Sequence, residues 1–195
     1  MQNHKPFILW LFGVPGSGKS TIANQLAHCL AGPLQIIDSD DIRSRITPNP
    51  QWTDEERHLV YRAMWEIATT LYRHQISSII AASAGGVSLD EYQRSAPPST
   101  VFVYLKCELE TAAARHPRRL YALASSQSQV RLPIIVGLKS QSTMTAREMD
   151  FTQRHGIVGY KITIPAKVDL ELDTTSETSL QDNIDRIMLL INEKQ

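Results

Sequence analysis

The stretch GVPGSGKS occupies residues 13–20 and has the spacing G-x-x-x-x-G-K-[ST]. Glycines at this spacing allow backbone N–H groups to turn inward onto a phosphate, while the lysine ammonium reaches the β- and γ-phosphates of a nucleotide. The hydroxyl that follows the lysine can ligate Mg²⁺. The pattern therefore predicts a nucleotide phosphate loop, and its candidate nucleotide-binding residues are Gly13, Val14, Pro15, Gly16, Ser17, Gly18, Lys19, Ser20 and Thr21.

The segments on either side of this loop predict a strand before it and a helix after it. Phe7–Phe12 is a run of six apolar residues, which is the length of a strand buried on both faces. From Lys19 onward, apolar residues recur at helical spacing, at Ile22, Ala23, Leu26, Ala27 and Leu30. The loop would then end at a helix N-terminus, where unpaired N–H groups and the helix dipole favour an anion.

Length and charge restrict the class of protein. The chain has 195 residues with 20 basic and 20 acidic side chains, which predicts one domain and argues against nucleic acid or an anionic membrane as the main partner. Cys29 and Cys107 have neither metal-site nor redox spacing, and we expect both to be reduced, packed thiols. The balanced charge makes a small anion the expected ligand. The N-terminus resembles neither a secretory signal nor a membrane span, so we expect a cytoplasmic protein.

Further strands and helices alternate along the chain. Apolar runs predict strands at Leu34–Ile37, Ser78–Ala82, Thr100–Leu105 and Val168–Leu172. Thr53 and Glu56 have capping-box spacing ahead of a long helix, whose expected buried stripe is Leu59, Val60, Ala63, Met64, Ile67, Ala68 and Leu71. Helices are also expected at Glu108–Arg115 and along a closing stripe of Leu180, Ile184, Ile187, Met188 and Ile191. This order predicts an α/β fold of the P-loop NTPase type, with three α/β/α layers and a mostly parallel, doubly wound sheet.

Acidic residues follow the second predicted strand, in the run Asp38-Ser39-Asp40-Asp41. Acids at the carboxyl end of a strand in such a sheet point toward the ligand crevice. Asp38 and Asp40 are therefore candidate catalytic residues together with Lys19. Either carboxylate could hold the waters of a Mg²⁺ bound by Ser20 or accept the proton of an attacking hydroxyl, and the alternative role of both is to cap a turn or the next helix.

Several segments resemble the adenylylsulfate kinase family, over nearly the whole chain. Besides the phosphate loop, Asp38–Arg43 (DSDDIR) is similar to the family's D-G-D-N-[IV]-R, and Trp52–Arg57 (WTDEER) to its F-S-x-x-D-R. Arg115–Tyr121 (RHPRRLY) resembles the family's lid sequence R-D-P-K-x-L-Y, and Leu172–Thr174 resembles its L-D-T.

The resemblance implies an enzyme that transfers the γ-phosphate of ATP to the 3′-hydroxyl of adenosine 5′-phosphosulfate, called adenylylsulfate below. ATP and Mg²⁺ are the expected cofactors, and of the open assignments above we place Ser20 and Asp38 on the metal. The resemblance also implies Asp40 as the base, because Asp40 matches the second aspartate of the family segment. A lid with an inserted loop is expected at about residues 115–165 of a single domain 1–195.

The resemblance assigns further residues to the two substrates. The acceptor, a nucleotide-like anion, would contact Arg43, Trp52 and Arg57, and the nucleotide would also contact Arg115, Arg118 and Thr174. Each has an alternative: exposed surface for Arg43 and Arg57, core packing for Trp52, and a helix C-terminus for the lid arginines.

The chain departs from the family on the acceptor and lid side. Val60-Tyr61-Arg62-Ala63 replaces an Asn-Ile-Arg-Arg run, Ser83–Ser88 replaces a Ser-Pro loop, and the segment from Tyr121 to Gly156 is longer. Two alternatives therefore stay open: a kinase of the same fold acting on another nucleotide derivative, a sugar or an antibiotic, and a nucleotide-binding regulator without catalysis. The oligomeric state also stays open, with a homodimer as one expectation.

Overall fold

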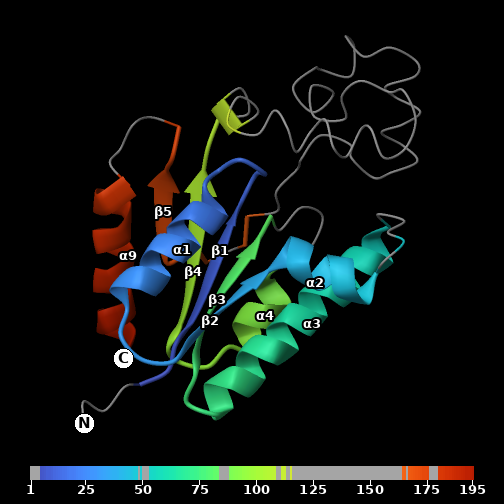
Figure 1. The fold of residues 1–195 in the computed structure, drawn as a ribbon, viewed down its shortest axis with the longest axis horizontal. Coiled ribbons are helices and arrows are strands. Elements are labelled where there is room, and N and C mark those ends of the chain that lie inside the picture. Colours follow the sequence, from blue (N-terminus) through green and yellow to red (C-terminus); the bar gives the residue numbers. More distant parts are fainter. Residues whose placement is uncertain are drawn as a thin grey trace.

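The fold is a parallel sheet between two layers of helices (Figure 1). The computed structural model describes residues 5–47, 49, 53–83, 88–108, 111–112, 115, 164–165, 167–175 and 180–195. Its strands are β1 (Ile8–Gly13), β2 (Leu34–Asp38), β3 (Ser77–Ala82), β4 (Thr100–Lys106) and β5 (Leu170–Asp173). They lie in the order β2-β3-β1-β4-β5, and every pairing is parallel. The predicted α/β fold with a doubly wound parallel sheet is confirmed.

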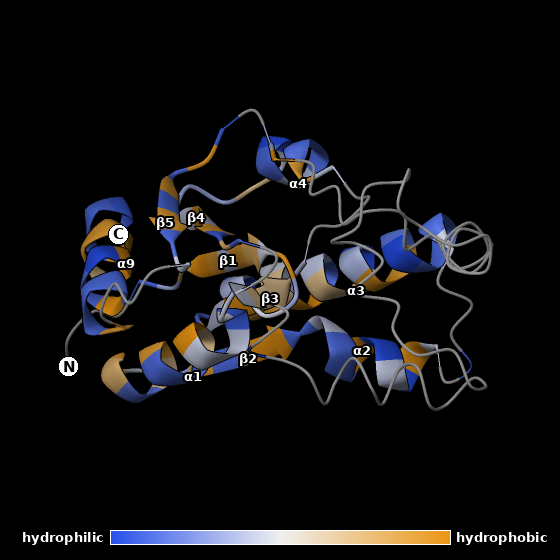
Figure 2. Cartoon of the chain, turned by 90° about the horizontal axis from the view of Figure 1, so that it is seen from above, coloured by the Kyte–Doolittle hydropathy of each residue, from blue (hydrophilic) through white to orange (hydrophobic). Residues whose placement is uncertain are grey.

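Helices cover both faces of the sheet. The described helices are α1 (Lys19–Cys29), α2 (Ser39–Ile46), α3 (Asp54–Arg73), α4 (Asp90–Arg94) and α9 (Leu180–Lys194). Apolar side chains of α1 and α9 pack on one face, and those of α3 and α4 pack on the other. Figure 2 shows mostly hydrophobic strands between them, whereas α2 is mostly hydrophilic. None of the described helices is long and apolar enough to cross a membrane.

Strand β1 is the centre of both cores. All six of its residues are buried, and alternate side chains point to opposite faces, because successive Cβ atoms in a strand do so. Trp10 lies on the α3 face, where its ring stacks on Trp65 at 5.7 Å and on Phe102 at 5.8 Å between ring centroids. Leu9 and Leu11 belong to the core under α1 and α9.

The predicted buried stripe of α3 was partly wrong. Leu59 and Ile67 are exposed at 52% and 38%, whereas Tyr61 and Trp65 are buried. The helix has more apolar residues than one face can hold, so its sequence is compatible with more than one buried stripe. The observed stripe is rotated about the helix axis relative to the predicted one. The buried face is the one that carries the large rings, because these rings pack against Trp10.

Other predictions needed smaller corrections. Helix α2 was not predicted, because it is short and has no buried residue, so it lacks an apolar period. The expectation that Cys29 is packed was wrong, since it is exposed at the last position of α1, whereas Cys107 is buried. Strand β5 begins at Leu170 rather than Val168. In the helix predicted at Glu108–Arg115, residues 111, 112 and 115 are helical and Glu108 is not. The other residues of that range lie outside the described residues.

Candidate functional site

The phosphate loop joins the carboxyl end of β1 to the first turn of α1. Gly16 has φ +89°, and a Cβ built on it would lie 2.2 Å from the carbonyl oxygen of Ala112. Gly18 has φ +91°, is the N-cap of α1, and has no heavy atom within 4 Å of the Cβ position. Both conformations favour glycine. Of these two residues, Gly16 also has no room for a side chain, because the backbone of Ala112, after β4, packs against it.

The lysine of the loop lies over the loop's own backbone. Lys19 Nζ donates hydrogen bonds to the carbonyl oxygens of Gly13 and Val14, both at 2.9 Å. The first turn of α1 has no side-chain cap among the described residues, because its N-cap is Gly18. A helix N-terminus and an ammonium therefore face the same short loop, which is the arrangement that binds phosphate.

Asp38 links this loop to α2. Its Oδ2 accepts a hydrogen bond from Ser20 Oγ at 3.0 Å, and its Oδ1 accepts one from the backbone N–H of Asp40 at 2.9 Å. Asp38 is therefore the N-cap of α2 and the neighbour of the predicted metal ligand at once. For Asp38, the alternative role as a helix cap is therefore compatible with the predicted role beside the metal ligand Ser20. Asp40 lies in the first turn of α2 and is exposed.

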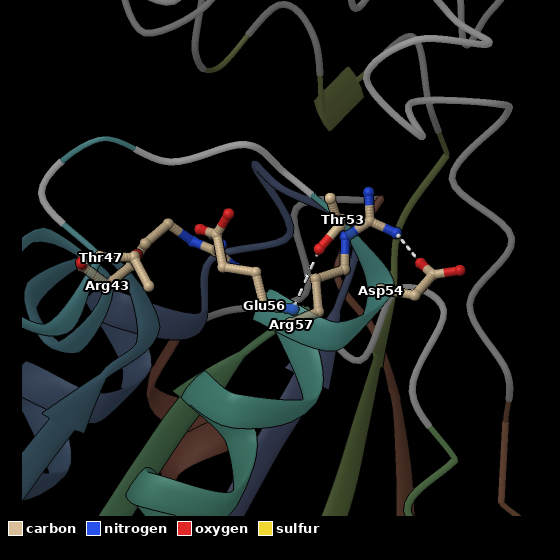
Figure 3. Close-up of polar contacts among 6 residues, drawn as sticks. All are labelled: Arg43, Thr47, Thr53, Asp54, Glu56 and Arg57. Carbon is tan, nitrogen blue, oxygen red and sulfur yellow. Dashed lines mark hydrogen bonds and ion pairs between the residues drawn. The ribbon is translucent and has the colours of Figure 1, made fainter.

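The two predicted acceptor arginines lie on α2 and α3, beside carboxylates (Figure 3). Arg43 Nη1 lies 2.8 Å from Glu56 Oε1, with both side chains about nine-tenths buried. Arg57 Nη1 lies 3.0 Å from Asp54 Oδ1 one turn of α3 away, and that aspartate is 72% exposed. The N-cap half of the predicted capping box is present, since Thr53 Oγ1 accepts the backbone N–H of Glu56 at 3.2 Å, while the Glu56 carboxylate accepts from Arg43.

Thr174 follows β5 at the same edge of the sheet and is buried. Its backbone N–H and its Oγ1 both donate to the carbonyl oxygen of Lys106, at 2.8 and 3.0 Å. The next residue, Thr175, accepts the backbone N–H of Glu108 at 2.9 Å. Thr175 also donates its backbone N–H to Asp173, and this hydrogen bond lowers the pKa of the Asp173 carboxyl. The segments after β4 and β5 are thus tied together behind the phosphate loop.

The lid predictions are only partly within the described residues. Arg115 is exposed, and its Nη1 lies 3.7 Å from the sulfur of Cys107. Trp52 and Arg118 lie outside the described residues, as do the Gly85-Gly86 loop and the insert from Ser125 to Thr145. Thr47, Glu56 and Thr175 were missed as contributors to the site. The capping box marked Glu56, but its partner Arg43 is on a helix that the sequence pattern did not predict.

The family model described as adenylylsulphate kinase matches residues 5–139. The chain belongs to the adenylylsulphate kinase family. The probable adenylyl-sulfate kinase of Bacillus subtilis is 34% identical over 145 residues, which is 71% of this chain and 72% of that protein. The one of Archaeoglobus fulgidus is 33% identical over 121 residues, which is 60% of this chain and 78% of that protein. The class of enzyme is therefore an ATP-dependent kinase.

Solved structures agree on the fold. The Mycobacterium tuberculosis APS kinase CysC, solved with AMPPNP and APS, has a TM-score of 0.65 at 19% identity and covers 96% of this chain and 98% of its own. A sugar kinase from Janibacter sp. has a TM-score of 0.60 at 20% identity, covering 96% and 95%. The architecture is thus shared by kinases with different acceptors.

Proposed function

We propose that this chain transfers the γ-phosphate of ATP to the 3′-hydroxyl of adenylylsulfate, giving 3′-phosphoadenylylsulfate. The observation that carries the proposal is the contact between Ser20 and Asp38, which joins the phosphate loop to the acidic start of α2. Donor and acceptor sites then meet at one edge of the sheet. The relatives named adenylyl-sulfate kinase and the CysC structure with APS support this choice of acceptor.

The donor half of the site is assigned to the phosphate loop. Lys19 and the backbone N–H groups of residues 13–21, except Pro15, stabilise the charge of the β- and γ-phosphates. Mg²⁺ fits the donor set, since Ser20 Oγ and Asp38 Oδ2 are hard oxygen donors 3.0 Å apart. In this assignment Ser20 binds the metal, and Asp38 holds it directly or through its waters. Mg²⁺ bound there supplies charge neutralisation on the transferred phosphoryl group.

The base is assigned to Asp40. Both oxygens of Asp38 are already engaged, one with Ser20 and one with the start of α2, which favours a metal-side role for Asp38. Asp40 lies in the first turn of α2 and is exposed, so its carboxylate is accessible to an acceptor. A carboxylate within reach of the 3′-hydroxyl can take its proton as the oxygen attacks the γ-phosphorus.

The acceptor half is assigned to Arg43, Trp52 and Arg57, as anion contacts and an aromatic face for the base. On the nucleotide side we assign Arg115, Arg118 and Thr174, with a lid at about residues 115–165 of one domain. For the assembly we propose a homodimer, which light scattering after size exclusion tests directly.

One observation favours a second candidate, a kinase of this fold for another hydroxyl. Val60 stands where the family has an asparagine, and it is completely buried in the core, so that position offers no polar side chain. A site that lacks a hydrogen-bonding group loses discrimination for the substrate that needs it.

A coupled assay of ADP release tests both candidates. Adenylylsulfate is compared with nucleotide diphosphates, sugars and aminoglycosides at saturating Mg-ATP. ADP release that depends on adenylylsulfate supports the proposal. Release with a different acceptor and none with adenylylsulfate replaces the acceptor and keeps the donor half. ATP binding without phosphorylation of any acceptor favours a regulator.

A further inference from the structure

The ion pair between α2 and α3 is buried on both sides. Arg43 Nη1 and Glu56 Oε1 are 2.8 Å apart, and the side chains are only 11% and 10% exposed. Burial removes water from both charges, so such a pair contributes little net stability compared with apolar packing. Its effect is better sought in the geometry that it imposes on Arg43.

The backbones of the same two residues are also held. Thr47 donates its N–H and its Oγ1 to the carbonyl oxygen of Arg43, both at 2.9 Å, which closes α2. Thr53 Oγ1 accepts the N–H of Glu56 at 3.2 Å, which opens α3. Two threonine caps and one ion pair therefore hold the end of α2 and the start of α3 (Figure 3).

We propose that Glu56 is a positioning residue, which holds the Arg43 guanidinium so that it meets an anionic group of the acceptor. A guanidinium carries five N–H donors in a planar fork, so a carboxylate at Nη1 fixes the plane while other donors can serve a ligand. The inference rests on the proposed function, because the acceptor is the anion that Arg43 would meet.

The neighbouring acids separate this role from a general effect of charge. Asp54, Glu55 and Glu56 all lie in the first turn of α3, where negative charge complements the helix dipole. Glu55 is exposed and its pKa is lowered by its own turn, through backbone and Thr53 hydrogen bonds. Glu55→Gln therefore removes the same charge from the same turn and leaves Arg43 held, which makes it the matched control.

Steady-state kinetics test the proposal. Glu56→Gln should raise KM for adenylylsulfate about tenfold, as expected for a charge-assisted hydrogen bond, and leave KM for ATP within about twofold. Glu55→Gln should change neither constant by more than about twofold. Glu56→Asp, which keeps the charge, should recover part of the loss. Equal KM values for adenylylsulfate in Glu56→Gln and Glu55→Gln would overturn the proposal.

A double-mutant cycle shows whether Glu56 acts through Arg43. If it does, Glu56→Gln should cost nothing further in an Arg43→Ala background, because the side chain that it positions is gone. Additive losses would mean that Glu56 acts independently of Arg43. A parallel rise in KM for ATP would indicate a general structural defect and also contradict the proposal.

An NMR measurement of the Arg43 guanidinium tests the positioning role of Glu56 independently of which acceptor the enzyme uses. Rotation of the Arg43 guanidinium should be slowed in the wild type and in Glu55→Gln, and fast in Glu56→Gln, with the signal assigned by Arg43→Lys. Wild type that turns over adenylylsulfate with a freely rotating Arg43 refutes the inference and keeps the function. Wild type with a held Arg43 and no turnover refutes the choice of acceptor, and the KM comparison is then made with the acceptor that the panel identifies.

Discussion

The proposed donor and acceptor sides of the site are held in different ways. The phosphate loop is fixed by backbone, since Lys19 bonds to loop carbonyls and Gly16 lies against the Ala112 carbonyl. The acceptor side is fixed by side chains, through the pairs Arg43–Glu56 and Arg57–Asp54 on helices outside the sheet. Backbone N–H groups recognise phosphate in any nucleoside triphosphate, whereas side-chain pairs depend on the identity of each residue. With the residue roles proposed above, one fold can keep its phosphate donor while substitutions at the side-chain pairs change its acceptor.

The largest expected effect is on the donor side. Lys19→Ala should lower kcat by about 10²–10³-fold, because it removes a preorganised charge from the γ-phosphate. The melting temperature, measured by circular dichroism, should stay close to that of the wild type, since the ammonium's hydrogen bonds to Gly13 and Val14 lie within the loop itself. Unchanged turnover would remove the phosphate loop from the mechanism.

The proposed base, Asp40, comes next. Asp40→Asn should lower kcat by about 10²-fold with little change in KM for ATP, because the amide keeps the size of the carboxylate but cannot accept a proton. Asp41→Asn is the control, since Asp41 is exposed in the same first turn of α2. Equal losses of rate and ATP affinity would assign Asp40 to the metal instead.

A pair of glycine substitutions tests the backbone of the donor side. Gly18→Ala should cost about 1–2 kcal/mol through its left-handed conformation alone. Gly16→Ala should cost more and raise KM for ATP further, because its Cβ would also collide with Ala112 O at 2.2 Å. Thermal unfolding and ATP kinetics of both variants provide the comparison. If the two substitutions are equivalent, the close approach of the Ala112 segment does not shape the loop.

The smallest effect is expected at the exposed ion pair of the acceptor side. Asp54→Asn should change the free energy of unfolding by less than about 1 kcal/mol, because Asp54 is 72% exposed and water screens the pair. KM for adenylylsulfate should rise less than in Glu56→Gln. A larger rise would show that the exposed pair, and not the buried one, orders the acceptor side.

The donor side was predictable because its determinants are local. Eight consecutive residues define the loop, and the apolar run before it and the helical period after it lie within a few positions of their structural bounds. Strand β1 is displaced from the predicted run by one residue at each end, which is the usual uncertainty of a strand boundary.

The acceptor side was less predictable because its determinants are contacts between distant residues. Helix α2 has no buried residue, so its sequence has no helical period of apolar residues that would predict it. The pairing of Glu56 with Arg43 on that helix could therefore not be predicted. The choice between Leu59 and Tyr61 on α3 depends on Trp10, which lies far away in the sequence and at the centre of the sheet. A pattern within one segment cannot report which of its faces a remote ring will occupy.

The stacked pair of Trp10 and Trp65 also has an optical consequence. Their centroids are 5.7 Å apart with an interplanar angle of 28°, and both indoles are buried. Indoles in such contact couple their excited states, so the near-ultraviolet circular dichroism should carry a signal that exists only while α3 is docked on β1. Near-ultraviolet signal is lost when tertiary packing loosens even if secondary structure persists. The core therefore contains its own reporter, and inactive variants can be sorted into those with a damaged site and those with a loosened interior.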